Sequence, residues 1–225
     1  MTIGIFLLLI LFLSFFALSF CLKQILPFST VHLITRIYCW LMLAVMIFYA
    51  IKIEKQKFLL YEEQKYPFGK ALLMFLSLGV IIFFGEIVIV LIPMLFGFSE
   101  EISQATKINL SVLKGNYLLA IFTCITAGVT EELLVRGYLQ TRLEKLFNNA
   151  WVGIFISSFF FGLMHTSWGS ILHIVATFWA GLVYAFFYYK YRNIKILIFV
   201  HMFHDLILIS LQLFHDNIIH TGLAF

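Results

Sequence analysis

Charged residues and cysteines are scarce in this sequence of 225 residues, and each scarcity excludes something. Only 12% of the residues are charged, whereas about a quarter are charged in a soluble domain, so an ordinary globular protein is excluded. The three cysteines, Cys21, Cys39 and Cys124, lie in separate apolar stretches without C-x-x-C spacing. This spacing predicts neither a disulfide framework nor a metal site. The basic residues form no patch, which argues against a nucleic-acid partner.

Long hydrophobic runs dominate what is present. The chain is 63% hydrophobic and 18% aromatic, with a mean hydropathy of +1.03. About 20 apolar residues cross a bilayer, and such runs predict seven spans: 3–21, 31–51, 69–98, 117–135, 150–164, 171–189 and 194–214. The third run contains Gly85, Glu86 and Pro93, so a kink there would give an eighth span. The first run lacks a basic segment before it and a cleavage site after it, unlike a signal peptide. We therefore expect an all-α, multi-pass transmembrane bundle that forms one domain over residues 1–225.

The distribution of basic residues predicts an orientation. With the N-terminus in the cytoplasm, the inner loops hold Lys52, Lys55, Lys57, Lys65, Lys70, Arg142, Lys145, Lys190, Arg192 and Lys195. The outer loops hold only Lys23, Lys107 and Lys114, and Arg36 and Arg136 lie at membrane depth. The positive-inside rule then places the N-terminus inside and the C-terminus outside for seven spans.

Two adjacent glutamates and an arginine stand in the fourth apolar run, within TEELLVRGYLQ. On an α-helix Glu132 and Arg136 are four residues apart in the favoured order for an ion pair. Glu131 is turned about 100° away and shares its face with Ala127 and Gly128. An unpaired carboxylate in a partly dry site suits a general base. The alternative is that both glutamates are solvated at the membrane boundary while Arg136 reaches the headgroups.

Ionisable residues recur in two later spans, and such groups in a membrane usually line a cavity or pair with each other. In WVGIFISSFFFGLMHTSWGS, the residues Ser157, Ser158, Phe161 and His165 share one stripe. A lone histidine at a helix end is also compatible with simple packing. In ILIFVHMFHDLILISLQLF, His201 and Asp205 are four residues apart, and His204 lies about 60° from His201. Packing alone does not explain two histidines and an acid within five residues.

A comparison of depths supports part of this grouping. Glu131 lies 17 residues before Asn148 and His165 lies 17 after it, so a straight hairpin places both about 26 Å from the turn. His201 fits less well, since it lies only 8 residues, or about 12 Å, beyond Asn193.

Taken in order, the motifs E-E-x-x-x-R, F-x-x-x-H and H-x-x-x-D resemble those of the CPBP family. This family comprises the CAAX proteases and bacteriocin-processing (Abi) intramembrane proteases, and it includes the type II CAAX prenyl endopeptidases. The resemblance covers about residues 117–214, the expected catalytic core, and extends to Gly137 after the arginine. The first hundred residues match only as hydrophobic spans.

The resemblance implies an intramembrane endopeptidase that needs no metal or other cofactor and sits in a bacterial cell membrane. Glu131 matches the catalytic glutamate, which activates water together with His165. His201 and Asp205 match the residues that position and stabilise the oxyanion, with Glu132, Arg136 and Phe161 in support. The prenyl-processing members typically have asparagine where this chain has Asp205, and an ionised aspartate cannot donate a hydrogen bond. Asp205 is therefore expected either to be protonated or to orient His201.

Three other functions fit parts of the pattern. Two histidines and a glutamate are compatible with a zinc protease, although H-E-x-x-H is absent and no cysteine stands near the histidines. A non-catalytic immunity or scaffold protein could bind a partner in the same cavity. A transporter could use the same residues as a relay, although the two halves of the chain show no repeat. The expected partners are the lipid bilayer and a membrane-associated peptide or protein substrate, whose identity the sequence does not predict.

Overall fold

The computed structural model describes residues 1–98 and 103–220, with side chains described as far as residue 213. Helices account for nearly all regular structure in these ranges, and they run in the order α1 (Thr2–Lys23), α2 (Phe28–Phe48), η1 (Tyr49–Ile53), α3 (Phe68–Leu95), α4 (Gln104–Leu113), α5 (Tyr117–Glu131), η2 (Glu132–Gln140), α6 (Thr141–Phe147), α7 (Ala150–Met164), η3 (Thr166–Trp168), α8 (Ile171–Tyr191) and α9 (Ile194–His220). Within a helix the backbone groups bond to one another, which is what a bilayer interior requires. The predicted all-α class is confirmed.

Seven helical segments of the described chain are long and apolar enough to cross a membrane, and seven is the predicted number. The protein is thus an integral, multi-pass membrane protein. The possible eighth span is absent from the described residues, because α3 continues as one helix through Gly85 and Glu86, with Pro93 near its end. The fourth span is longer than predicted: it runs on through η2 and α6 to Phe147. The expected core ends at Phe214, which lies in α9 but beyond the described side chains.

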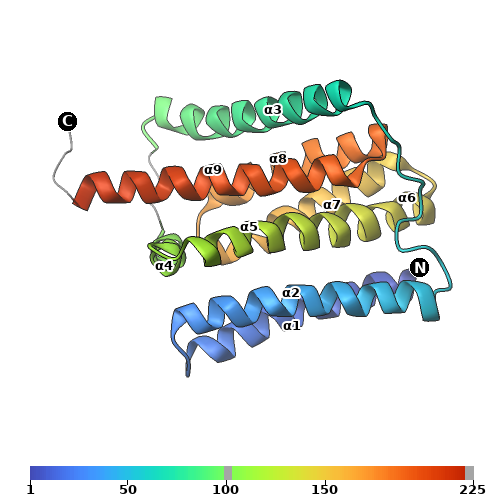
Figure 1. The fold of residues 1–225 in the computed structure, drawn as a ribbon, viewed down its shortest axis with the longest axis horizontal. Coiled ribbons are helices and arrows are strands. Elements are labelled where there is room, and N and C mark those ends of the chain that lie inside the picture. The colour runs from blue at the N-terminus through green and yellow to red at the C-terminus, as the bar shows by residue number, and fades with distance from the viewer. Residues whose placement is uncertain (99–102, 221–225) are drawn as a thin grey trace.

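The helices are arranged in three layers (Figure 1). The α1–α2 hairpin lies along one side, α5, α7, α8 and α9 form the middle, and α3 lies along the other side. One apolar cluster joins α1 and α2 to η2 through residues such as Leu8, Met46 and Tyr138. A second cluster joins α3 to α8 and α9 through residues such as Ile82, Tyr184 and Leu197.

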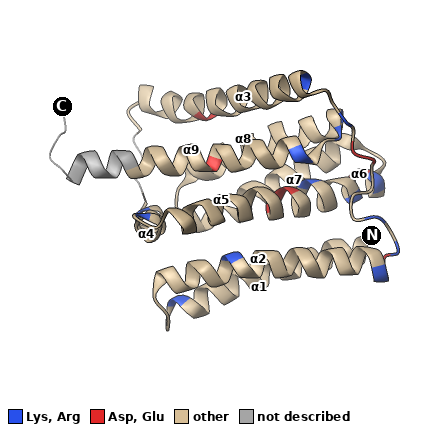
Figure 2. Ribbon diagram, viewed as in Figure 1, with Lys and Arg blue, Asp and Glu red and all other residues tan. Residues whose placement is uncertain are grey.

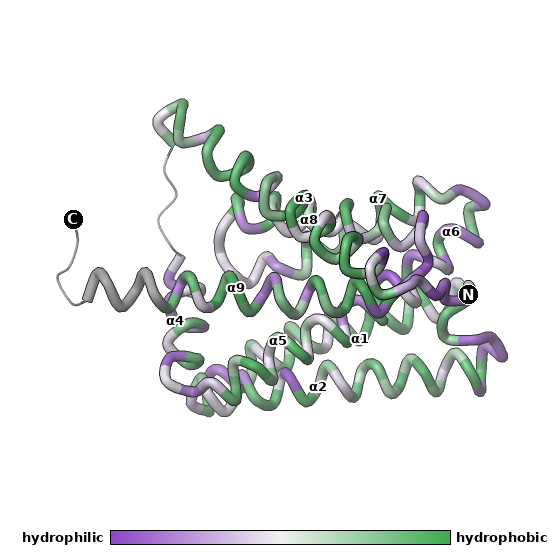
Figure 3. The backbone as a smooth tube through the Cα atoms, turned by 45° about the horizontal axis from the view of Figure 1, so that its top comes forward, coloured by the Kyte–Doolittle hydropathy of each residue, from purple (hydrophilic) through white to green (hydrophobic). Residues whose placement is uncertain are grey.

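Polar residues collect at the end of the bundle that holds the N-terminus (Figure 3). Lysine and arginine gather at this same end (Figure 2), as expected from the count of basic residues in alternate loops. The helices between the two ends are predominantly apolar. This end remains the predicted cytoplasmic face.

A connecting segment without regular secondary structure, residues 54–67, crosses that end and is fixed to it by side chains. The Arg142 guanidinium donates to Glu54 Oε2 at 2.8 Å and to the Phe58 carbonyl at 2.7 Å. The Ile194 amide donates to Glu63 Oε2 at 2.6 Å at the start of α9. These contacts connect the loop to both the fourth and the seventh spans.

Ionisation of these two loop carboxyls differs because their neighbours differ. Burial raises the pKa of Glu63 above its ordinary value. Burial acts in the same direction on Glu54, but the hydrogen bond and charge of Arg142, with the N-terminal ammonium 3.5 Å away, bring its pKa below the ordinary value.

Candidate active site

The site is built around a change of helix type in the fourth span. Glu131 is the last residue of α5, and Glu132 begins the π-helical segment η2. A π-helix has wider turns than an α-helix and often marks a functional site. The 100° per residue assumed from the sequence therefore does not hold beyond Glu131.

The predicted ion pair between Glu132 and Arg136 is present and completely buried. The Arg136 Nη1 donates to Glu132 Oε1 at 3.1 Å, and neither side chain is exposed to solvent. Arg136 Nη2 also donates to the Gly181 carbonyl of α8 at 3.3 Å. The guanidinium lies over the rings of Phe161 at 4.1 Å and Tyr184 at 5.3 Å, both favourable cation–π positions.

The same glutamate also binds the first histidine of α9. His201 Nδ1 donates to Glu132 Oε1 at 2.8 Å, so one carboxylate oxygen joins the arginine and the histidine. The Tyr184 ring stacks on the imidazole at 5.4 Å, and the Phe161 ring meets it edge-on at 5.9 Å. These contacts fix both the position and the plane of His201.

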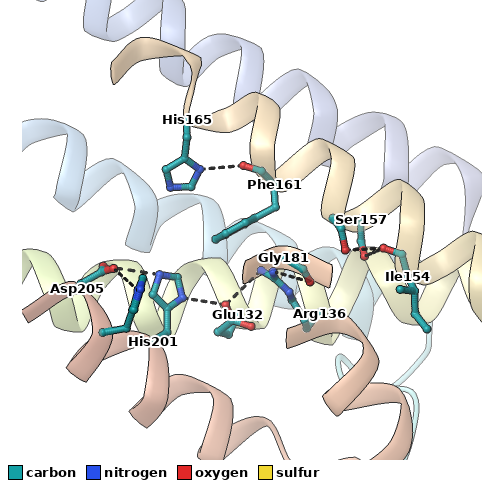
Figure 4. A network of polar contacts seen from close by, with 11 residues as sticks. Glu132, Arg136, Ile154, Ser157, Phe161, His165, Gly181, His201 and Asp205 are labelled. Carbon is teal, nitrogen blue, oxygen red and sulfur yellow. Dashed lines mark hydrogen bonds and ion pairs between the residues drawn. The ribbon is translucent and has the colours of Figure 1, made fainter. Parts of the chain in front are cut away.

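Asp205 lies on the other side of the His201 ring (Figure 4). Its Oδ2 atom is 3.6 Å from His201 Nε2, and its Oδ1 atom is 3.8 Å from His204 Nδ1. His204 Nε2 in turn donates to Glu86 Oε2 on α3 at 2.8 Å. A chain of polar contacts thus leads from Arg136 to Glu86 and connects three helices.

His165 terminates α7, and Figure 4 shows it above the row formed by Asp205, His201 and Glu132. Its Nδ1 atom lies 2.8 Å from the Phe161 carbonyl oxygen. A carbonyl can only accept, so Nδ1 carries the hydrogen and Nε2 of the neutral ring keeps a free electron pair. The ring is therefore held in the tautomer that can accept a proton at Nε2.

Glu131 is half-buried, and the charges of His201, Asp205 and Arg36 act on it. Its buried Oε2 atom has no hydrogen-bond partner among the described residues. This agrees with the expectation that Glu131 is the unpaired carboxylate. No hydrogen bond or ion pair joins it to His165 within the described part of the chain, so their joint action on water stays a prediction.

The poor fit of His201 in depth has a structural explanation. The ion pair between Glu144 and Arg192, at 2.8 Å, sets the α8–α9 turn level with Glu144 rather than with Asn148. Glu132 is 12 residues from Glu144, and His201 is 9 residues from Arg192, which correspond to about 18 and about 14 Å on an α-helix. The wider turns of η2 shorten the first distance further, and the two side chains meet.

Two members of the network were missed by sequence reasoning. The sequence places Glu86 inside the third apolar run, but nothing in it indicates that this residue faces His204. Tyr184 gave no signal, because one tyrosine among ten in an apolar chain is not distinctive.

The donors do not converge on a common point. Among residues 1–98 and 103–213, no group of three histidine, cysteine, aspartate or glutamate side chains is arranged to ligate one metal ion. The histidines instead point to carboxylates and to a backbone carbonyl. The zinc alternative is left to a direct chemical test, given below.

Fold and site together define a class: a membrane-embedded helical bundle with buried carboxylates and histidines on neighbouring spans. Comparison with known proteins shows what the chain is similar to. Residues 114–207 match the family described as type II CAAX prenyl endopeptidase Rce1-like. This match confirms the predicted resemblance to the CPBP family, and it contains the three motifs, whereas α1, α2 and α3 lie outside it.

One curated relative is similar over much of the same length. It is a Bacillus subtilis (strain 168) protein named "Putative membrane peptidase YdiL", 28% identical over 118 residues. The match covers 52% of this chain and 46% of the relative, so the chain corresponds to about half of that protein. No solved structure matches the chain significantly.

Proposed function

We propose that the protein is an intramembrane endopeptidase that hydrolyses a membrane-associated peptide or protein. The observation that carries this proposal is the buried contact of His201 with Glu132, beside a Glu131 oxygen that has no hydrogen-bond partner among the described residues. The family match and the name of the relative support a membrane peptidase. The substrate and the residue roles below are part of the proposal.

Water is the second substrate of such a reaction, and the site offers places for it. Glu131 Oε2, Glu132 Oε2 and Arg136 Nε are buried polar atoms without a hydrogen bond to any described residue. Buried polar atoms of this kind are normally satisfied by ordered water. A water bound here would lie beside the carboxylate proposed as the base.

In the proposed reaction Glu131 removes a proton from water as the water oxygen bonds to the peptide carbonyl carbon. His165 Nε2, with its free electron pair, holds the second hydrogen of that water. The carbonyl oxygen becomes negatively charged, and His201 donates to it from Nε2; because Nδ1 already donates to Glu132, His201 acts here as the imidazolium, with a hydrogen on each ring nitrogen. The carbon–nitrogen bond then breaks, and the proton held by Glu131 passes to the leaving amine.

Of the two roles open to Asp205, the geometry favours orientation of His201. Each oxygen of Asp205 faces an imidazole nitrogen, at 3.6 and 3.8 Å. An aspartate in this position holds the His201 ring from one side while Glu132 holds it from the other. His201, rather than Asp205, then supplies the donor to the oxyanion.

The test is to compare peptides in membrane fractions containing the wild-type protein, Glu131→Gln or His165→Ala. Loss of a defined set of cleavage products in both variants, with the helical content unchanged, is the expected result. Glu62→Gln, which removes an exposed carboxylate of the 54–67 loop, is the matched control and should keep full cleavage. Full cleavage by Glu131→Gln would end the proposal.

The other functions are distinguished by two further assays, complementation of a phenotype and transport across liposomes. An immunity or scaffold protein would complement its phenotype even as the Glu131→Gln variant, without any peptide products. A transporter would move a solute across liposomes with no cleavage.

A further inference from the structure

We infer that Glu86 and His204 are positioning residues of this site, which hold Asp205 and through it His201. The inference rests on the proposed function and adds to it, because Glu86 belongs to α3 and lies outside the matched segment 114–207. Neither residue is placed in contact with the reacting atoms. They act on Asp205, whose carboxylate faces His201, the proposed donor to the oxyanion.

The contact between the two residues is close and buried. His204 Nε2 donates to Glu86 Oε2 at 2.8 Å, and the two side chains are only 8% and 14% exposed. The Phe83 ring packs against the imidazole, with ring centroids 4.8 Å apart and the planes tilted by 54°. The His204 ring therefore has one defined orientation.

That orientation determines which atom of His204 meets Asp205. With Nε2 bonded to Glu86, the remaining nitrogen, Nδ1, faces Asp205 Oδ1 at 3.8 Å. The other oxygen of Asp205 faces His201 Nε2 at 3.6 Å. Asp205 thus has one histidine at each oxygen, and loss of Glu86 frees one side of it.

Attachment of α3 to the bundle does not explain this pair. Met74, Leu78 and Ile82 of α3 are already buried against α8 and α9. A carboxylate within a span is costly to insert, and an apolar residue would pack without that cost. The polar contact is therefore expected to serve a purpose beyond attachment.

Close approach of α3 makes the contact possible. A Cβ atom added at Gly85 would lie 2.0 Å from Nε1 and 2.2 Å from Cε2 of Trp179 on α8. Glycine at this position lets the two helices touch next to Glu86. The sequence thus combines a small residue and an acid at the level of His204.

Several titratable groups besides this pair act on Asp205, and the experiment has to separate them. Those outside the pair are His201 on its own helix, His165 on α7, Tyr184 on α8, and Glu131 and Cys124 on α5. His204 itself is faced by Glu86 from α3 and by Asp205 from α9. Substitutions at Glu86 change this set from the α3 side only.

The experiment compares wild type with Glu86→Gln, His204→Gln and Glu86→Asp in proteoliposomes, on a peptide that the wild type cleaves. Glu86→Gln and His204→Gln should lower kcat about 10–100-fold, the range known for groups that orient metal-binding histidines. They should leave KM within about threefold and displace the pH–kcat profile, while Glu86→Asp should recover part of kcat. The matched control is Glu63→Gln, since Glu63 is also a carboxylate that binds α9, through the Ile194 amide. It should keep the kcat and the pH profile.

A second readout does not depend on activity. Nitrogen NMR of ¹⁵N-histidine reports which ring nitrogens carry hydrogen. Glu86→Gln should alter the His204 and His201 signals, and Glu63→Gln should leave both unchanged. If the wild type cleaves and Glu86→Gln keeps its kcat, its pH profile and its histidine signals, the inference is wrong. If the wild type cleaves nothing, the proposed function fails. The NMR comparison alone then decides whether Glu86 and His204 position Asp205 and His201.

Discussion

Replacement of either member of the Glu132–Arg136 pair should strongly destabilise the bundle. Both side chains are fully buried, and Glu132 Oε1 accepts from Arg136 at 3.1 Å and from His201 at 2.8 Å. Without Glu132, Arg136 keeps only the Gly181 carbonyl, at 3.3 Å, as a hydrogen-bond acceptor among the described residues. Removal of one partner of a buried pair costs about 3–5 kcal/mol, because the other charge is left unpaired.

The assay is reversible unfolding in mixed detergent micelles, followed by circular dichroism. Glu132→Ala and Arg136→Met should each lower the free energy of unfolding by about 3–5 kcal/mol. The double variant removes both charges, so it should be less destabilised than the sum of the two by about 0.5–3 kcal/mol. Simple additivity of the two losses would show that the charges are not coupled and would refute the reasoning.

Three further predictions concern other parts of the molecule. Gly128→Ala places a Cβ 2.4 Å from the Met202 side chain and 3.0 Å from the Ile198 carbonyl, so it should lower the free energy of unfolding by about 1–3 kcal/mol. The control is Gly79→Ala, whose Cβ meets nothing within 4 Å and which should not lower that free energy. The pKa of Glu54 is lower in the folded state than in the unfolded state. Ionised Glu54 therefore stabilises the fold at neutral pH, and this stabilisation is lost as the pH falls below about 4. The difference in unfolding free energy between wild type and Glu54→Gln should vanish at that acidic pH. EDTA or phenanthroline should leave peptide cleavage unchanged, and activity that a chelator removes and zinc restores would establish the metal alternative.

The spans and their order could be predicted because hydropathy and the need to bond every backbone group leave few choices in a membrane. The ion pair of Glu132 and Arg136 was also predictable, since both residues lie on one helix and the spacing alone brings them together. The boundaries were less accurate. The fourth span continues to Phe147, because most polar residues after Val135 are buried and pair within the protein; these are Arg136, Gln140, Thr141, Arg142 and Glu144.

Contacts between helices were much harder to predict. The meeting of His201 with Glu132 depends on the level of the α8–α9 turn, which the Glu144–Arg192 ion pair sets from residues far from the site. The contact between Glu86 and His204 depends on which face α3 turns to α9, and an apolar helix gives no sign of this. The π-helical turns at Glu132 also have no sequence signal that helical periodicity would detect.

The central claim is that Glu131 activates water for peptide hydrolysis inside the membrane. The most direct measurement is cleavage in water enriched in ¹⁸O, with purified wild type and Glu131→Gln in proteoliposomes containing extracted membrane proteins. The wild type should place one ¹⁸O atom in each new C-terminal carboxylate, and Glu131→Gln should form these termini about 10²–10⁴-fold more slowly. Formation of the labelled termini at the wild-type rate by Glu131→Gln would contradict the account.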